Sequence, residues 1–105
     1  MDKGEALKIA GRYIDAISSK YVVLQAFMFG SFAKGTNHED SDIDIAIVVT
    51  NVSDIIDTQI DMMKLRRKVD LRIEPHPFAM TDFNNENPVV DEILKSGIQI
   101  KNRRV

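Results

Sequence analysis

The chain has 105 residues, enough for one domain with a single core but too few for a catalytic domain plus a separate substrate-binding domain. Its net charge of -2 gives no general attraction to nucleic acid or to membranes. The lack of cysteine excludes disulfides and thiolate-ligated zinc or iron–sulfur sites. Since the sequence shows neither a long apolar run nor a signal peptide, we expect a cytoplasmic protein.

The first half of the chain predicts one helix and two strands. Residues 5–18 carry apolar side chains at helical spacing, which favours an amphipathic helix. Residues 21–29 and residues 42–49 are rich in β-branched and aromatic side chains, which indicates two buried strands. Because the connection between these strands is short, we expect them to lie antiparallel, with the end of one beside the start of the next.

A second helix and a third strand are predicted next. Residues 52–68 return to the helical period, and residues 69–74 alternate as a strand that Pro75 and Pro77 are expected to end. A helix is the usual crossover between parallel strands. The third strand should therefore begin at the edge of the sheet where the second begins.

The last part of the chain predicts a short helix and a short strand. Asn87 before Pro88 is a typical helix start, Gly97 is a typical stop, and residues 98–100 are expected to form a last strand. The sequence therefore predicts a single domain spanning residues 1–105, of the α/β (α+β) class. Its helices pack on a small mixed β-sheet in the order α-β-β-α-β-α-β.

Acidic side chains are expected to meet at one edge of this sheet. Asp42 and Asp44 begin the second strand and, because side chains alternate along a strand, both face the same way. Asp70 is near the start of the predicted third strand, so we expect it close to them. Carboxylates in such a group repel one another unless a cation lies between them, and Mg²⁺ is a hard ion that prefers these ligands. The three aspartates therefore predict a magnesium site, in which paired ions could clamp an in-line displacement.

A turn suited to phosphate precedes these aspartates. Gly30 and Ser31 follow the first strand, and a short helical segment after them would aim backbone N–H groups and the Ser31 hydroxyl at a triphosphate. Lys34 is close enough in the sequence to add a positive charge. The combination predicts metal-assisted nucleotide chemistry.

Other interpretations of nearby residues stay open. Glu74 shares the predicted third strand with Asp70 and competes with it for the role of third carboxylate. His38 and His76 lack metal-ligand spacing and are expected to be solvated loop residues. Three apolar residues after the predicted third strand either offer a binding surface or pack beneath their loop: Phe78, Met80 and Phe83. A small basic tail is expected to be a solvated terminus: Lys101, Arg103 and Arg104.

Phe29-Gly30-Ser31 and Asp42-Ile43-Asp44 resemble the signature of the DNA polymerase β-like nucleotidyltransferase superfamily. That signature is an apolar residue and Gly-Ser or Gly-Gly, followed after a spacer of similar length by Asp-x-Asp in a strand. The family's third carboxylate lies on a later strand, and Asp70 looks like its counterpart. The short chain resembles the minimal nucleotidyltransferases of prokaryotes.

The resemblance implies roles for the matching residues. Asp42 and Asp44 would hold two magnesium ions, while Asp70 would share one ion and help to deprotonate the acceptor hydroxyl. Three residues of the turn would bind the nucleoside triphosphate, with the Ser31 hydroxyl on its β- and γ-phosphates: Gly30, Ser31 and Lys34. Many relatives carry arginines where this chain has Phe32 and Lys34, so the turn holds one cation, without the guanidinium fork.

The resemblance also implies a partner and a reaction. Minimal members are often paired with a small helical HEPN-domain toxin and act as the antitoxin of a type VII toxin–antitoxin system. Some of them transfer AMP from ATP to a tyrosine of that toxin. Two alternatives remain: a non-catalytic antitoxin that neutralises its partner by occlusion, and a transferase that acts on a small-molecule hydroxyl. The short chain counts against the small-molecule transferase, because such enzymes usually carry a further domain that holds the acceptor.

Overall fold

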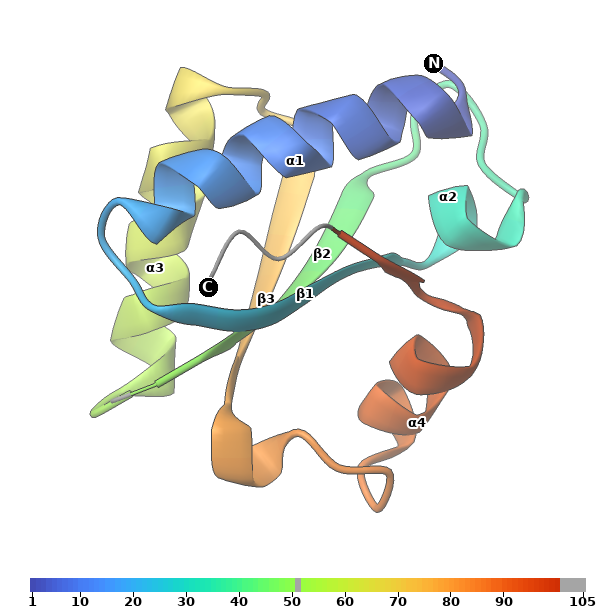
Figure 1. Ribbon diagram of the computed structural model, residues 1–105. Helices are drawn as coiled ribbons and strands as arrows, with labels where there is room; N and C mark the ends of the chain where they lie inside the picture. The colour runs from blue at the N-terminus through green and yellow to red at the C-terminus, as the bar shows by residue number, and fades with distance from the viewer. Residues whose placement is uncertain (51, 101–105) are drawn as a thin grey trace.

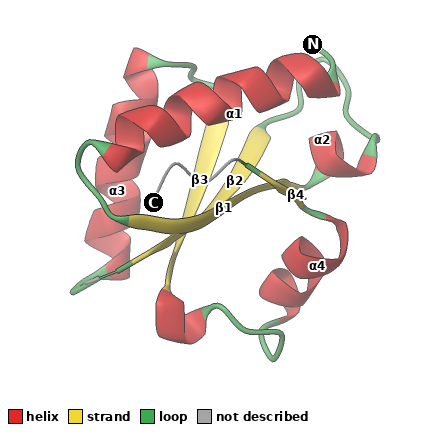
Figure 2. Ribbon diagram, viewed as in Figure 1, coloured by secondary structure: helices red, strands yellow, loops and turns green. Residues whose placement is uncertain are grey.

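The fold is a four-stranded mixed β-sheet with helices on both faces, as seen in a computed structural model that describes residues 1–50 and 52–100 (Figures 1 and 2). The strands are β1 (Val23–Phe29), β2 (Ile43–Val49), β3 (Ile73–Ala79) and β4 (Ile98–Gln99). The helices are α1 (Lys3–Ser18), α2 (Ser31–Lys34), α3 (Ile55–Leu65) and α4 (Pro88–Ser96), with short 3-10 turns η1 (Arg66–Lys68) and η2 (Met80–Asp82).

The strand pairing confirms the predicted fold class. The strands lie in the order β3-β2-β1-β4, with β1 antiparallel to β2 and to β4. β2 and β3 are parallel, and α3 forms the crossover between them. The ends of β1 and the starts of β2 and β3 therefore meet at one edge of the sheet.

Two hydrophobic layers flank the sheet. On one face, α1 and α3 cover a large core that includes the alternating residues Ile43, Ile45 and Ile47 of β2. On the other face, Ile93 of α4 packs with Phe27 in a smaller cluster. Figure 1 shows α1 and α4 on different sides of the sheet. Because side chains alternate along β2, Asp44 faces the α4 side, away from the larger core.

Side-chain caps fix the starts of the three longer helices. Asp2 forms a capping box with Glu5 at the start of α1. Asp54 accepts hydrogen bonds from two backbone N–H groups of α3, and Asn87 accepts one from Val89 in α4. Asp54 places the start of α3 at residue 55, later than the predicted start at residue 52.

The predicted position of the third strand is wrong. β3 begins at Ile73, where the sequence pattern placed residues 69–74, and it continues through Pro75 and Pro77 to Ala79. The prolines are tolerated because β3 is an edge strand, and a proline whose nitrogen faces away from β2 loses no ladder hydrogen bond.

Side chains from α3 and η1 satisfy the outer edge of β3. Gln59 donates to the Pro75 carbonyl at 3.1 Å, and Arg66 donates to the Ile73 carbonyl at 2.8 Å. The backbone acceptors that a neighbouring strand would otherwise use are thereby occupied within the chain.

The basic tail from residue 101 to residue 105 lies outside the described residues. Within the described part of the chain, no helix is both long and apolar enough to cross a membrane.

Candidate active site

Gly30 brings the turn after β1 into contact with the acidic end of β2. Phe29, the last residue of β1, is the pairing partner of Asp44. Gly30 has a φ of 77° and a ψ of -151°, a conformation essentially restricted to glycine. A Cβ atom at this position would overlap the Asp44 carboxylate. Glycine is therefore required both by the backbone and by the approach of this carboxylate.

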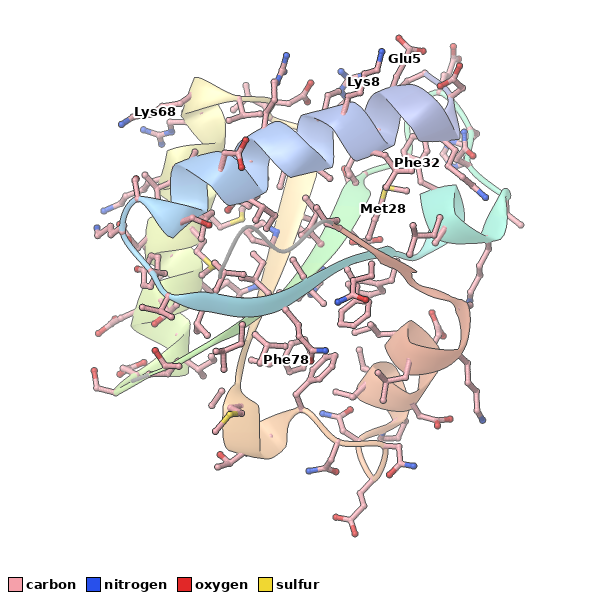
Figure 3. The ribbon with its side chains drawn as sticks, in the orientation of Figure 1. Glu5, Lys8, Met28, Phe32, Lys68 and Phe78 are labelled. Carbon is pink, nitrogen blue, oxygen red and sulfur yellow. The ribbon has the colours of Figure 1, made fainter. Side chains whose placement is uncertain are left out.

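The short helix α2 follows this turn, as the sequence predicted. The Phe32 side chain is only 1% exposed and packs in the larger core, so it anchors α2 to the rest of the fold. Figure 3 shows Phe32 and Met28 beneath α1. Ser31 is partly exposed, and its hydroxyl makes no hydrogen bond within the described residues. Phe32 thus has a structural role in anchoring the turn, and Ser31 keeps a free hydroxyl beside Gly30.

Lys34 links α2 to α4. Its ammonium lies 3.2 Å from the Glu92 carboxylate, and both side chains are about half exposed. Ion pairs this exposed contribute little to stability. Lys34 could therefore release the Glu92 carboxylate and bind another anion at little cost in free energy.

Asp42 and Asp44 lie at the start of β2, where the sequence placed them. Asp42 precedes the strand and is exposed, and the Asp44 side chain is 28% exposed on the face that α4 shares. Glu74 of β3 is the pairing partner of Asp44 and is also partly exposed. Three carboxylates therefore come from the starts of two parallel strands, with Glu74 directly next to Asp44.

His76 contacts Asp44, which contradicts the expectation that it is a solvated loop residue. It lies within β3, and its Nε2 is 3.2 Å from Asp44 Oδ1. The Phe29 ring packs edge-on against the imidazole, with 5.0 Å between ring centroids. The Phe29 ring and the Asp44 carboxylate therefore both hold the imidazole in place.

Asp70 lies before β3 rather than on a strand, so its predicted position on the strand is wrong. Its carboxylate accepts hydrogen bonds from the Arg72 guanidinium at 2.9 Å and 2.7 Å, and from the Arg72 backbone N–H at 2.9 Å. The Arg72 hydrogen bonds lower the pKa of Asp70 below its usual value of 3.8. Its Oδ1 and Oδ2 atoms are therefore both engaged by Arg72.

The donor set at this edge is suited to a hard cation. Asp42, Asp44 and Glu74 supply carboxylate oxygens, which are the ligands that Mg²⁺ prefers. Within residues 1–50 and 52–100, however, no group of three or more His, Asp or Glu side chains is already gathered tightly enough to hold a metal ion. Side-chain rotations would be needed to complete such a site.

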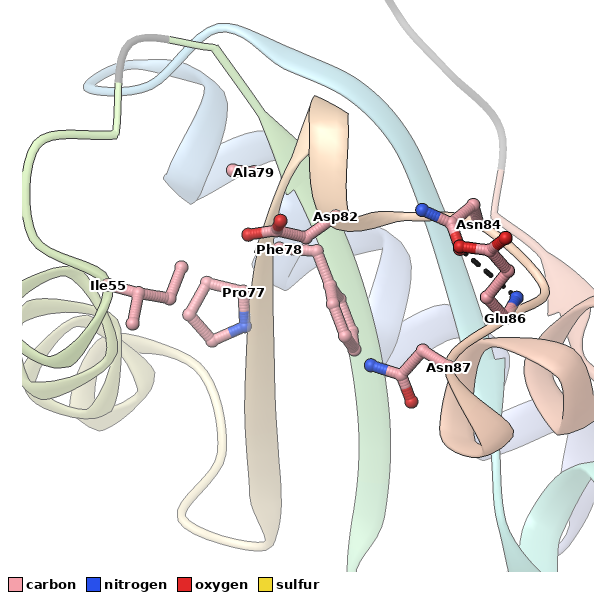
Figure 4. Close-up of a pocket in the computed structure, with 8 residues that line it drawn as sticks. All are labelled: Ile55, Pro77, Phe78, Ala79, Asp82, Asn84, Glu86 and Asn87. Carbon is pink, nitrogen blue, oxygen red and sulfur yellow. Dashed lines mark hydrogen bonds between the residues drawn. The ribbon is translucent and has the colours of Figure 1, made fainter.

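A pocket of about 510 Å³ opens at the opposite end of β3 (Figure 4). Phe78 and Pro77 form its wall from the strand, while Asn87 and Asp82 contribute polar groups. Phe78 pairs with Val48, four residues beyond Asp44, so the pocket lies roughly 13 Å along the sheet from the carboxylates. None of the predicted site residues lines it.

The three apolar residues after the predicted third strand divide between the two expected roles. Phe78 and Phe83 pack against the smaller core, with 5.4 Å between their ring centroids. Met80 is 61% exposed. Of the three, Met80 is the exposed one, and Phe78 also forms part of the wall of the pocket described above.

A family model described as "Polymerase beta, Nucleotidyltransferase" matches residues 12–104. The chain belongs to this nucleotidyltransferase family. Among solved structures, it is similar to a Sulfolobus solfataricus protein described as a nucleotidyltransferase, with 21% identity and a TM-score of 0.69 over 96% of this chain and 84% of that one. The polymerase β-like fold predicted from the sequence is thereby confirmed.

Two further structures similar to this nucleotidyltransferase domain are toxin–antitoxin structures. One was solved with AMP-PNP and has 21% identity and a TM-score of 0.66, over 90% of this chain and 74% of that one. The other is a mutant of the toxin–antitoxin MntA–HpeT, with 18% identity and a TM-score of 0.58, over 99% of this chain and 76% of that one. A search of curated proteins found no match. Likeness at these identities shows the shared fold.

Two residues beside Asp44 in the candidate site were missed or ranked second by the sequence analysis. His76 and Glu74 alternate along β3 with the buried residues Ile73, Pro75 and Pro77. The alternation is readable in the sequence once proline is accepted in an edge strand. It predicts Glu74 and His76 on one face, which is the face of Asp44.

Proposed function

We propose that this protein transfers a nucleoside monophosphate, AMP from ATP, to a hydroxyl group of a partner protein. The acceptor in the proposal is a tyrosine of a HEPN-type toxin, and the protein acts as the antitoxin of a type VII system in the cytoplasm. Its family membership supports a transferase. The toxin–antitoxin neighbours, one of them with an ATP analogue, support the partner and the nucleotide.

One observation carries the proposal: the glycine of the Gly-Ser turn lies against the second aspartate of the Asp-x-Asp motif. Gly30 leaves no room for a side chain beside Asp44, and Ser31 directly follows with an unpaired hydroxyl. A triphosphate held at Ser31 would place its phosphorus atoms next to the carboxylates. Nucleotidyl transfer needs the triphosphate and the carboxylates at the same place.

The reaction needs an acceptor hydroxyl, a base and a leaving group. The acceptor oxygen forms a bond to the α-phosphorus, and the bond from that phosphorus to the bridging oxygen of the β-phosphate breaks, releasing pyrophosphate. A carboxylate takes the hydroxyl proton. Asp42 and Asp44, with a third carboxylate, would hold Mg²⁺, which supplies charge stabilisation to the phosphate oxygens when bound.

Two residues are candidates to supply the third carboxylate that would hold Mg²⁺. Asp70 was assigned by resemblance, but Arg72 holds it in the turn before β3. Glu74 is the pairing partner of Asp44 and faces the same side of the sheet. We favour Glu74, and we expect Glu74→Gln to reduce transfer far more than Asp70→Asn at matched stability. A larger loss of transfer in Asp70→Asn than in Glu74→Gln would instead support Asp70 as the third carboxylate.

Intact-mass analysis tests the proposed reaction. The protein encoded beside this one would be incubated with ATP, Mg²⁺ and either the wild-type chain or the Asp42→Asn/Asp44→Asn double variant. We expect a gain of one or more AMP units only with the wild type, and mapping by fragmentation should place it on a tyrosine. Asp82→Asn, which removes an exposed carboxylate at the far pocket, is the matched control and should transfer normally.

Neutralisation without any mass gain would favour the occlusion alternative. In that case the double variant should neutralise the toxin as well as the wild type does. A mass gain on a small-molecule hydroxyl, with none on the protein, would favour the third alternative.

A further inference from the structure

A second surface feature lies on the outer side of α3, on the opposite face of the sheet from Asp44. A groove of about 390 Å³ is lined by three apolar and three basic residues: Ile60, Met63, Leu71, Lys64, Arg66 and Arg67. It runs along the last turns of α3 and reaches the turn before β3. Helix α3, at the left of Figure 1, packs against β3, whose start lies behind α1 nearer the middle of the view.

The apolar floor of the groove is unusually open to solvent. Ile60 is 50% exposed and Leu71 is 67% exposed, and Ile56, one turn before Ile60, is 66% exposed. Ile56, Ile60 and Met63 follow one another at spacings of four and three residues, so they form a stripe along one face of the helix. Large aliphatic side chains gathered in one exposed stripe are typical of a surface that another molecule covers.

The rim of the groove is basic. Lys64, Arg67 and the adjacent Lys68 form no ion pair within the described residues, and Figure 3 shows Lys68 projecting outward near the end of α3. The whole chain carries a net charge of -2, so this positive patch is a local concentration against the overall balance. The nearby Asp61 pairs with Lys20 and also interacts electrostatically with Lys64, so the rim is most positive at Arg67 and Lys68. An occupant of the groove should therefore carry carboxylates around an apolar centre.

A second copy of this chain fits the groove poorly. A symmetric pairing of two such surfaces would bring Arg67 and Lys68 of one copy near the same cations of the other. The like charges would repel one another. The charge pattern therefore favours a different protein as the occupant.

The groove adjoins the acidic edge of the sheet. Arg66, which lines the groove, donates to the Ile73 carbonyl and lies 4.0 Å from the Glu74 carboxylate. Glu74 in turn pairs with Asp44. Arg66 therefore connects the groove to the edge strand β3, and a partner held in the groove would extend around this edge to reach the carboxylates on the other face of the sheet.

We propose that this groove, which we call the α3 groove, docks an amphipathic acidic segment of the toxin partner, from which the acceptor hydroxyl reaches the carboxylates around the edge strand β3. The proposal rests on the proposed function, because it takes the occupant to be the protein that receives the nucleotide. The aliphatic stripe supplies the buried contact, and the basic rim sets the orientation and the rate of association.

Binding measured separately from transfer tests the docking proposal. The probe is the purified protein encoded beside this chain, titrated calorimetrically with the full-length wild type and its variants, without ATP. We expect Ile60→Glu and Leu71→Glu each to weaken binding at least tenfold. Arg67→Glu/Lys68→Glu should also weaken binding and reduce its dependence on salt.

Three controls match these variants. Val89→Glu places a carboxylate at a 50% exposed aliphatic residue of α4, and Lys3→Glu/Lys8→Glu reverses two exposed charges on α1. Both should bind as the wild type does. The Asp42→Asn/Asp44→Asn variant should bind normally while transferring nothing.

The outcomes separate the two proposals. Equal binding by the wild type and the groove variants overturns docking at the α3 groove and leaves the transfer reaction intact. No binding by the wild type overturns both the partner and the docking surface. Binding of anionic phospholipid vesicles by the wild type, lost in the groove variants while the protein probe is unaffected, would make the groove a membrane contact and also overturn the proposal.

Discussion

Gly30 combines a backbone requirement with a contact requirement, and Gly35 is a second positive-φ glycine that has the backbone requirement of a left-handed residue without the contact. Gly35 has the same φ of 77°, but a Cβ atom there would meet nothing within 4 Å. Gly35→Ala therefore reports the backbone cost alone, about 1 to 2 kcal/mol for a left-handed residue. Gly30→Ala adds the greater strain of a backbone at φ 77° and ψ -151°, which essentially only glycine adopts, and the overlap with the Asp44 carboxylate.

We expect Gly30→Ala to lower the free energy of unfolding by more than Gly35→Ala does. It should also reduce nucleotide transfer by on the order of 100-fold, because displacing a reacting group by about 1 Å has effects of this size. Urea unfolding and single-turnover transfer by both variants check this. Similar transfer by the two variants would show that Asp44 tolerates displacement.

His76 is predicted to position Asp44. His76→Phe would keep a ring against Phe29 but remove the nitrogen that lies 3.2 Å from the carboxylate. Changes to groups that orient a metal ligand typically cost 10- to 100-fold, so we expect transfer to fall by on the order of 10-fold. We also expect weaker Mg²⁺ binding by calorimetry, with partial rescue by His76→Gln. Unchanged Mg²⁺ affinity in His76→Phe would limit His76 to packing.

At the scale of single elements, the start of α4 depends on one side chain. Asn87 Oδ1 accepts a hydrogen bond from the Val89 N–H at 2.9 Å. Asn87→Ala should lower the free energy of unfolding by about 1 kcal/mol, as measured by urea denaturation. Asn85→Ala is the matched control, because Asn85 is exposed and makes no hydrogen bond among the described residues, and it should change stability little. Equal effects would contradict the capping role.

The elements also show what local sequence patterns can and cannot predict. Helical spacing and the Asn87 cap predicted α1 and α4, and the short connection predicted that β1 and β2 are antiparallel. β3 lies further along the chain than predicted, because an edge strand can accept the prolines that usually end a strand. Glu74, and not Asp70, therefore lies at the start of the strand.

These local patterns could not predict contacts between residues that are far apart in the sequence. Lys34 pairs with Glu92 and Phe32 is buried beneath α1, yet nothing in the turn itself indicates either arrangement. The Gly-Ser and Asp-x-Asp motifs were placed correctly, because they lie at the ends of two adjacent strands. Local motifs thus predicted where the candidate site residues lie in the fold, and only the tertiary structure shows which residues surround them.

At the scale of the whole molecule, acid should remove the stabilisation that comes from the Asp70–Arg72 pair. The pKa of Asp70 is lowered from 3.8 in the folded protein. The pair therefore contributes fully above pH 3.8, and its contribution is lost as the pH falls through the lower folded pKa. Asp70→Asn should have a lower Tm than the wild type at pH 7, and the two values should converge at strongly acidic pH.

Thermal unfolding followed by circular dichroism between pH 7 and pH 2 checks this. Asp82→Asn removes an exposed carboxylate without an ion pair in the described chain, and it should lower the Tm at neither end of the range. A constant difference between Asp70→Asn and the wild type at every pH would mean that charge is not the source of the stabilisation.

The prolines of β3 also govern how this protein can associate with others. Pro75 and Pro77 offer no N–H to a strand arriving from solvent, and Gln59 and Arg66 already occupy two of the carbonyls on that side. Growth of the sheet by intermolecular pairing, as in fibril formation or peptide capture by strand addition, is blocked at this border. Any complex formed at this edge must be built from side-chain contacts, because the backbone there offers few hydrogen bonds to another chain.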